Sequence, residues 1–257
     1  MLQAHSILWH YLWVAPNLFL LSLGIVLARK RESREAFPIF VAFCFLAALS
    51  ELAVYSADVL PFISGPVFWR VDWVALIIEG CVKFVLIGEI FAAVFGSYTS
   101  LARLGRLLIR GVGVALVMTA SIAAALAPKS NTIGIIAGAH LLEQTIFLIE
   151  SGLLLFIFGF ASYFRLSFDR ATFGISVGLA ISSCVHLATW AVMANSNVAD
   201  SARYHLDFLN MATYHFCVLI WFYYLLVPGR VVAKSAVPLP ENNLAVWNRE
   251  LERLLQQ

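Results

Sequence analysis

Long apolar segments dominate this sequence and limit what it can fold into. Each is long enough to cross a hydrocarbon layer about 30 Å thick as a helix. Seven such segments run approximately over residues 6–28, 37–60, 67–96, 107–127, 133–163, 171–194 and 204–227. Apolar residues make up 61% of the chain and charged residues 12%, whereas soluble domains are about a quarter charged. We therefore predict an all-α, polytopic membrane helical bundle with seven transmembrane helices.

The positions of lysine and arginine predict the orientation of this bundle, because cytoplasmic connections carry an excess of both. If odd-numbered spans run from outside to inside, the inner connections hold thirteen of these residues: Arg29, Lys30, Arg31, Arg34, Arg103, Arg106, Arg110, Arg165, Arg170, Arg230, Lys234, Arg249 and Arg253. The outer connections hold three, which are Arg70, Lys129 and Arg203. We expect a multi-pass protein of the inner (plasma) membrane with its N-terminus outside. The bundle would cover residues 1–229, and residues 230–257 would form a cytoplasmic tail.

The third apolar segment carries two opposite charges near its middle, Glu79 and Lys83. Isolated charges at that depth cost a few kcal/mol each, so they are normally paired or functional. Their i,i+4 spacing, with the acid first, places both on one helix face in the favourable order for an ion pair.

Further polar residues fall in the same layer of the membrane. The rise of 1.5 Å per residue places them roughly 9 to 24 Å below the outer ends of their spans, with Glu150 deeper. The candidate ligand-binding or proton-relay residues are Glu51, Glu79, Lys83, His140, Glu143, Glu150, His186, Asn210, Tyr214 and His215. They predict a polar cavity that opens to the outside and is lined in part by a stripe with Gln144 on the fifth span.

Three uses of this polar layer stay open: a closed network that fixes helix register, a binding cavity, or a proton or ion pathway. In a pathway, Glu89 and Glu150 would be inner steps toward the cytoplasm. We predict no cofactor. The alternatives are a haem between His140 and His186, and a metal ion bound by His140, Glu143, His186 and His215. The four cysteines, Cys44, Cys81, Cys184 and Cys217, all fall within spans and are interpreted as small core residues.

The tail has helix-start chemistry at Asn242 or Asn243, followed by one apolar stripe. The stripe consists of Leu244, Trp247, Leu251 and Leu254. A helix this short is not stable alone, so it either lies on the inner leaflet or docks a cytoplasmic protein partner through residues 240–257.

Several seven-span families can be compared with particular residues. The third span ends without the acid–arginine–aromatic triplet of rhodopsin-like receptors, and the last span has no lysine to hold retinal. His205 and His215 stand ten residues apart, which does not match the histidine pairs of ceramidase-like zinc hydrolases. With no nucleophile or nucleotide-binding motif present, the sequence favours a protein that is not an enzyme.

Two stretches, IGEIFAAVF in the third span and ENNLAVWNRELERLLQ in the tail, carry a general resemblance. In them the chain resembles uncharacterised seven-span proteins of bacterial inner membranes, a resemblance that implies no activity and no site residues. The first functional hypothesis is a membrane sensor or binding module with a docking tail. The alternatives are a proton- or ion-coupled transporter and an accessory subunit of a larger membrane complex. Lipid is the expected surrounding partner, and the net charge of +2 gives no indication of nucleic-acid binding.

Overall fold

The computed structural model describes residues 6–95, 132–163, 166, 168–193 and 200–228, with isolated helical positions at 107, 111, 114, 118 and 253. Every regular element in these ranges is an α-helix. The helices are α1 (Ile7–Arg29), α2 (Arg31–Ala36), α3 (Pro38–Val59), α4 (Gly65–Phe95), α6 (Thr132–Tyr163), α7 (Arg170–Met193) and α8 (Asp200–Leu226).

Six of the seven predicted apolar segments coincide with long helices, namely α1, α3, α4, α6, α7 and α8. The predicted segment 107–127 lies outside the described residues except at four helical positions, 107, 111, 114 and 118. The predicted tail lies outside them except at Arg253. Five of the described helices, all but α4 among the long ones, are long and apolar enough to cross a membrane. The chain is therefore a membrane-like helical bundle.

α4 differs from the other long helices because it carries five charged residues within 31. These are Arg70, Asp72, Glu79, Lys83 and Glu89. At 1.5 Å per residue it is about 46 Å long, which is more than enough for a crossing. Three of these charged residues, Asp72, Glu79 and Lys83, line the candidate functional site.

Local chemistry fixes where several helices begin. The side chain of Ser6 accepts a hydrogen bond from the Trp9 N–H at 3.2 Å and so caps α1. α3 begins with Pro38 at its first position, where a missing N–H costs nothing. At the start of α7, Asp169 accepts from the Thr172 N–H at 2.9 Å and also from the Thr172 hydroxyl.

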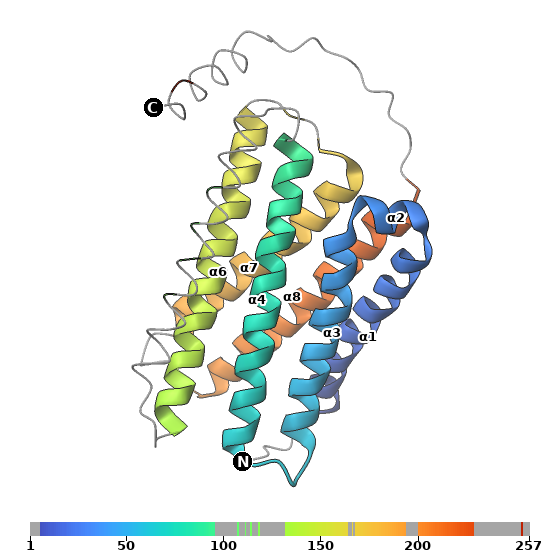
Figure 1. Ribbon diagram of the computed structural model, residues 1–257. Coiled ribbons are helices and arrows are strands. Elements are labelled where there is room, and N and C mark those ends of the chain that lie inside the picture. The colour runs from blue at the N-terminus through green and yellow to red at the C-terminus, as the bar shows by residue number, and fades with distance from the viewer. Residues whose placement is uncertain are drawn as a thin grey trace.

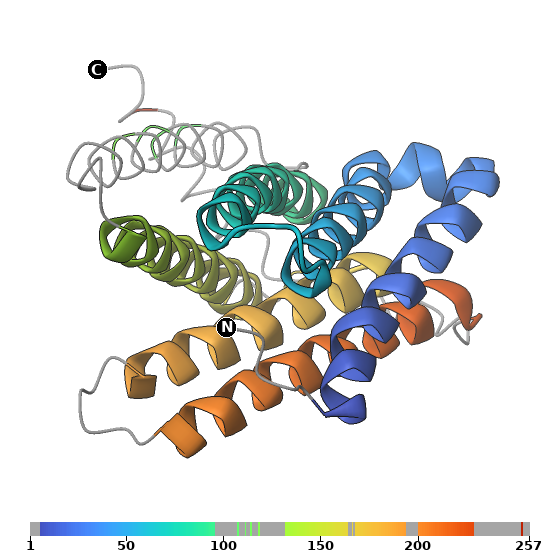
Figure 2. The ribbon, with the colours of Figure 1, turned by 90° about the horizontal axis from the view of Figure 1, so that it is seen from below.

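The six long helices form a closed ring. α1 packs on α3, α3 on α4, α4 on α6, α6 on α7, α7 on α8, and α8 returns to α1. Figure 1 shows the ring from the side, with α4 at the front and α7 and α8 behind it. Figure 2, seen from below, shows α7 and α8 on the side opposite α3 and α4.

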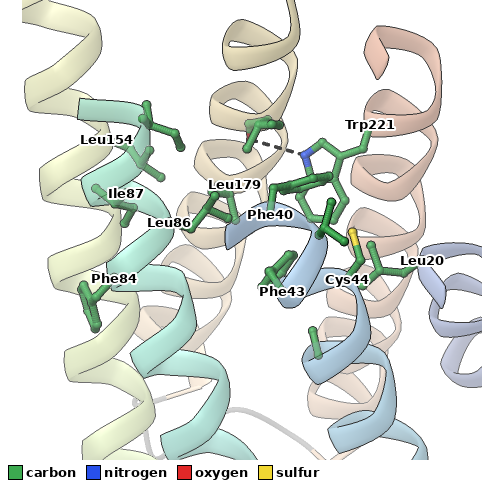
Figure 3. Packing of buried hydrophobic residues seen from close by; sticks show 14 of the residues in the cluster. Leu20, Phe40, Phe43, Cys44, Phe84, Leu86, Ile87, Leu154, Leu179 and Trp221 are labelled. Carbon is green, nitrogen blue, oxygen red and sulfur yellow. Dashed lines mark hydrogen bonds between the residues drawn. The ribbon is translucent and has the colours of Figure 1, made fainter. Parts of the chain in front are cut away.

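One end of the ring is filled by apolar side chains. Phe40 and Phe43 of α3 make edge-on ring contacts with Trp221 of α8, at centroid distances of 5.5 and 5.7 Å. The Trp221 indole donates a hydrogen bond to the Ile175 carbonyl at 3.3 Å, drawn as a dashed line in Figure 3. Leu86, Leu154 and Leu179 bring α4, α6 and α7 into the same core.

Glycines let α7 approach α8 closely at this end. A Cβ atom at Gly174 would lie 2.2 Å from the Tyr224 Cβ, and one at Gly178 would lie 2.2 Å from the Trp221 Nε1. Both positions therefore depend on the absent side chain, as in small-residue contacts between membrane helices generally.

Arg170, the first residue of α7, binds the end of α8. Its guanidinium donates a hydrogen bond to the Tyr223 carbonyl at 3.2 Å and lies 5.1 and 5.6 Å from the ring centroids of Tyr223 and Tyr224. A cation at a helix C-terminus also interacts favourably with the helix dipole.

The prediction for the cysteines is half wrong. Cys44 and Cys217 are buried, but Cys81 and Cys184 are exposed on the outer surface of the bundle. The outer surface of a membrane protein is apolar, as its core is. Apolar neighbours in the sequence therefore do not show whether a cysteine lies in the core or faces lipid.

Candidate functional site

The other end of the ring encloses a cavity of about 610 Å³. It lies where α1, α4, α6 and α8 begin and where α3 and α7 end, which is the lower end in Figure 1. Its polar wall consists of Asn17, Glu51, Asp72, Glu79, Lys83, Glu143, Ser182, His186, Tyr204, Asp207, Asn210 and Tyr214. Its aromatic wall adds Trp9, Trp13, Phe147 and Trp190. This volume is in the range of small-molecule sites.

Lys83 occupies the inner part of this wall and contacts two carboxylates. Its Nζ is 2.9 Å from Glu79 Oε1 and 3.7 Å from Glu150 Oε2, and it lies 5.1 Å from the Phe147 ring centroid. Lys83 is 6% exposed and Glu150 is fully buried. The predicted pair of Glu79 and Lys83 is thus confirmed, and Glu150 joins it from α6. The sequence also predicts Glu150 as an inner step of a pathway, and this stays a prediction, with the Glu150 carboxylate beside Lys83.

Glu51 of α3 forms a separate contact with α1. Its Oε2 accepts a hydrogen bond from the Trp13 indole N–H at 3.1 Å. Glu51 also lies within electrostatic range of Glu79 and Lys83, so the cavity joins the two groups of charges.

Asn17, one helical turn after Trp13, contributes an acceptor. Its Nδ2 donates to the Trp13 carbonyl at 2.8 Å. Its Oδ1 is buried and has no hydrogen-bond partner within the described part of the chain. The carbonyl contact fixes the amide orientation, since a carbonyl can only accept, and Oδ1 is left needing a donor.

α7 and α8 supply the opposite wall. His186 stacks on Phe147 with ring centroids 4.5 Å apart, and its Nδ1 donates to the Ser182 carbonyl at 3.2 Å. Thr189 donates to Asn210 Oδ1 at 2.9 Å. The Tyr214 hydroxyl is buried with no partner among the described residues.

Some predicted site residues are not brought to the cavity. His215 instead faces α1, with its ring 5.9 Å from Tyr11 and 5.7 Å from Phe19. Gln144 is exposed on the outside of α6. Glu89 accepts the Ile39 N–H at 3.4 Å and so helps to cap the start of α3.

Other predictions fall outside the described residues. The backbone of His140 is part of α6, but its side chain is not described, and neither are the tail residues Leu244, Trp247, Leu251 and Leu254. The haem hypothesis, which needs His140, therefore stays a prediction. For the metal hypothesis, the described residues contain no group of three or more histidine, cysteine, aspartate or glutamate side chains that could hold an ion.

Sequence reasoning missed Asn17, Trp13, Asp72 and Ser182 as lining residues. Asn17 had a detectable signal, because it is an amide near the middle of an otherwise apolar span, directly after Pro16. Trp13 had none, since a tryptophan near a span end is ordinary for a membrane interface.

Comparisons with known proteins add no relative: no family model, no curated protein and no solved structure matches this chain. The functional conclusion consequently depends on the geometry of the cavity.

Proposed function

We propose that this protein is an integral membrane binding module that takes a small ligand from the outside and reports its presence through a cytoplasmic tail. The observation that carries the proposal is the polar cavity of about 610 Å³ within a ring of apolar helices. A bundle that needed its charges only for register would be expected to close around them, because an unfilled polar space forfeits packing. This one instead leaves room for a ligand beside the charges.

The orientation in this proposal depends on the uneven distribution of lysine and arginine, thirteen against three. In this orientation the ends of α3 and α7, and with them the cavity, would lie on the outer side of the plasma membrane. The C-terminus would then be cytoplasmic. There, residues 240–257 would bind a cytoplasmic protein partner through the apolar stripe of the tail.

A cavity-filling substitution tests the binding function. Met211 lines the cavity, whereas Leu209 on the same helix is 48% exposed on the outer surface of the bundle. The full chain in lipid nanodiscs would be dialysed against a mixture of small cellular metabolites, and retained compounds identified by mass spectrometry. We expect retention by the wild type and by Leu209→Trp, and its loss in Met211→Trp. Retention no greater than that of empty nanodiscs would refute the proposal, as would equal retention by both variants.

A proton- or ion-coupled transporter is the second candidate, and the fully buried Glu150 beside Lys83 favours it. Charged groups inside membrane bundles often mark ion pathways. Reconstitution in liposomes separates the two functions. A transporter moves the retained compound or protons across the bilayer without a partner protein, and the exchange stops in Glu150→Gln. A binding module retains its ligand but shows no flux.

A further inference from the structure

The inner part of the cavity holds more negative than positive charge among the described residues. Lys83 is already contacted by two carboxylates, Glu79 and Glu150. Glu51 adds a third carboxylate to the same region, and its hydrogen-bond donor there is the neutral Trp13 indole. A carboxylate in a low-dielectric site is costly without a balancing charge. A cationic ligand would supply that charge.

Asn17 provides an independent observation that points to a ligand with hydrogen-bond donors. The residue is only 2% exposed, lines the cavity, and holds an Oδ1 with no described partner. A buried acceptor that has lost its water and gained no donor destabilises the site. The Tyr214 hydroxyl, also unpartnered in the described chain, lines the same cavity. A ligand that brings an N–H group would satisfy Asn17.

Aromatic rings make up the rest of the environment that an organic cation needs. Trp9 and Trp13 pack edge to face with centroids 4.5 Å apart, and both line the cavity together with Phe147. Ring faces attract ammonium groups, and Lys83 already lies over the Phe147 ring at 5.1 Å. A volume of about 610 Å³ is far larger than a bare metal ion requires.

We propose that the ligand is a protonated organic amine whose ammonium group lies at the Glu51 side of the cavity and donates to Asn17. Its apolar or aromatic body would lie against the tryptophans. This inference deepens the proposed binding function and depends on it.

Four matched probes test the inference on the full chain in lipid nanodiscs. They are 2-phenylethylamine, its N,N,N-trimethyl derivative, the neutral 2-phenylethanol and the anionic 3-phenylpropionate. Binding would be measured by calorimetry at neutral pH. We expect 2-phenylethylamine to bind most tightly, the trimethyl derivative more weakly because it has no N–H, and the neutral and anionic probes weakest.

Two substitutions assign the contacts. Glu51→Gln keeps an acceptor for Trp13 but removes the charge, and we expect the amine to bind about tenfold to a hundredfold more weakly. Asn17→Leu should weaken the amine about tenfold and leave the trimethyl derivative unchanged. Glu89→Gln is the matched control, because it removes an acid of the same bundle that does not line the cavity, and it should bind like the wild type.

Each contrary result has a defined meaning. Binding of 3-phenylpropionate or 2-phenylethanol as tight as that of the amine overturns the inference and leaves the proposed binding function standing. An unchanged affinity in Glu51→Gln does the same. Absence of binding by all four probes overturns the inference, while the dialysis experiment above decides the binding function separately.

Discussion

The two ends of the helical ring solve the packing problem in opposite ways. At the end where α3 and α7 begin, glycines meet large aromatic rings, as Gly178 meets Trp221, and the interior is filled. At the other end the same six helices present carboxylates, amides and tryptophans around about 610 Å³ of space. We call these the closed end and the open end.

The difference shows that the side chains at each end, and not only the ring of helices, decide whether the interior is filled. Small residues at the closed end let α7 and α8 approach until a tryptophan fills the gap. At the open end, Ser182 and His186 of α7 and Asn210 and Tyr214 of α8 line the cavity. Polar groups there need hydrogen bonds more than apolar contact. We therefore expect apolar packing at the closed end to stabilise the bundle more than the contacts around the cavity do.

The largest effect is expected from Lys83→Met, at the inner limit of the open end. It leaves the fully buried Glu150 without its cation, and breaking a buried pair in this way costs about 3–5 kcal/mol. The free energy of unfolding would be measured by denaturant titration in mixed micelles. Arg31→Met is the matched control, because it breaks an exposed i,i+4 pair with Glu35 at 2.7 Å and should cost less than about 0.5 kcal/mol. Equal losses in the two variants would argue against a structural role for the buried cluster.

Adding a single methyl group at the closed end should destabilise the protein. Gly178→Ala places a Cβ against the Trp221 indole, and overpacking of this kind costs about 1–3 kcal/mol. Gly152→Ala, whose new Cβ would meet nothing within 4 Å, should instead stabilise the protein by about 0.4–1 kcal/mol. The same unfolding titration compares the two, and a loss of stability in Gly152→Ala would contradict the packing described here.

Trp221→Phe tests the same contact, between the Trp221 indole and α7, from the other side. It removes the indole N–H that donates to Ile175 and should cost about 1 kcal/mol. Because the smaller ring also vacates the space that Gly178→Ala needs, the double variant should be more stable than the sum of the two losses predicts. Additive losses would mean that the indole is not the obstacle.

The smallest effect is expected from removal of residues 240–257. If the bundle over 1–229 is a unit of its own, the truncated chain should unfold within about 0.5 kcal/mol of the full chain. It should also retain the same ligands in dialysis. A large loss of stability would indicate that the tail packs under the bundle instead of serving a partner.

Much of the fold could be predicted because apolar length alone defines a membrane helix. The predicted segments 37–60 and 171–194 differ from α3 and α7 by one residue at each end. The pair of Glu79 and Lys83 could be predicted as well, since spacing within one helix fixes which side chains meet. The spacing of Gly174 and Gly178 also favours a close contact between helices, although the spacing does not identify the partner helix.

The residues that line the cavity could not all be predicted, because the sequence does not show how each helix is rotated about its axis. His215 and Tyr214 are neighbours in sequence, yet only Tyr214 lines the cavity, because successive residues on a helix point about 100° apart. Depth was the better guide: Glu150 is 17 residues into its predicted span and Lys83 is 16 into its own, so both lie roughly 25 Å deep. Equal depth is necessary for their contact, but the rotation that turns the two side chains toward each other is seen only in the structure.

The contact of Arg170 with the end of α8 has a mechanical consequence. It ties the first turn of α7 to the last turn of α8, while the glycines below it leave little room for sliding. The two helices should therefore tilt as one stiff rod. Asn210, in the cavity wall, lies 16 residues before the end of α8, or about 24 Å along its axis. A small rotation of these helices at the cavity should therefore also move the end of α8 beside Arg170.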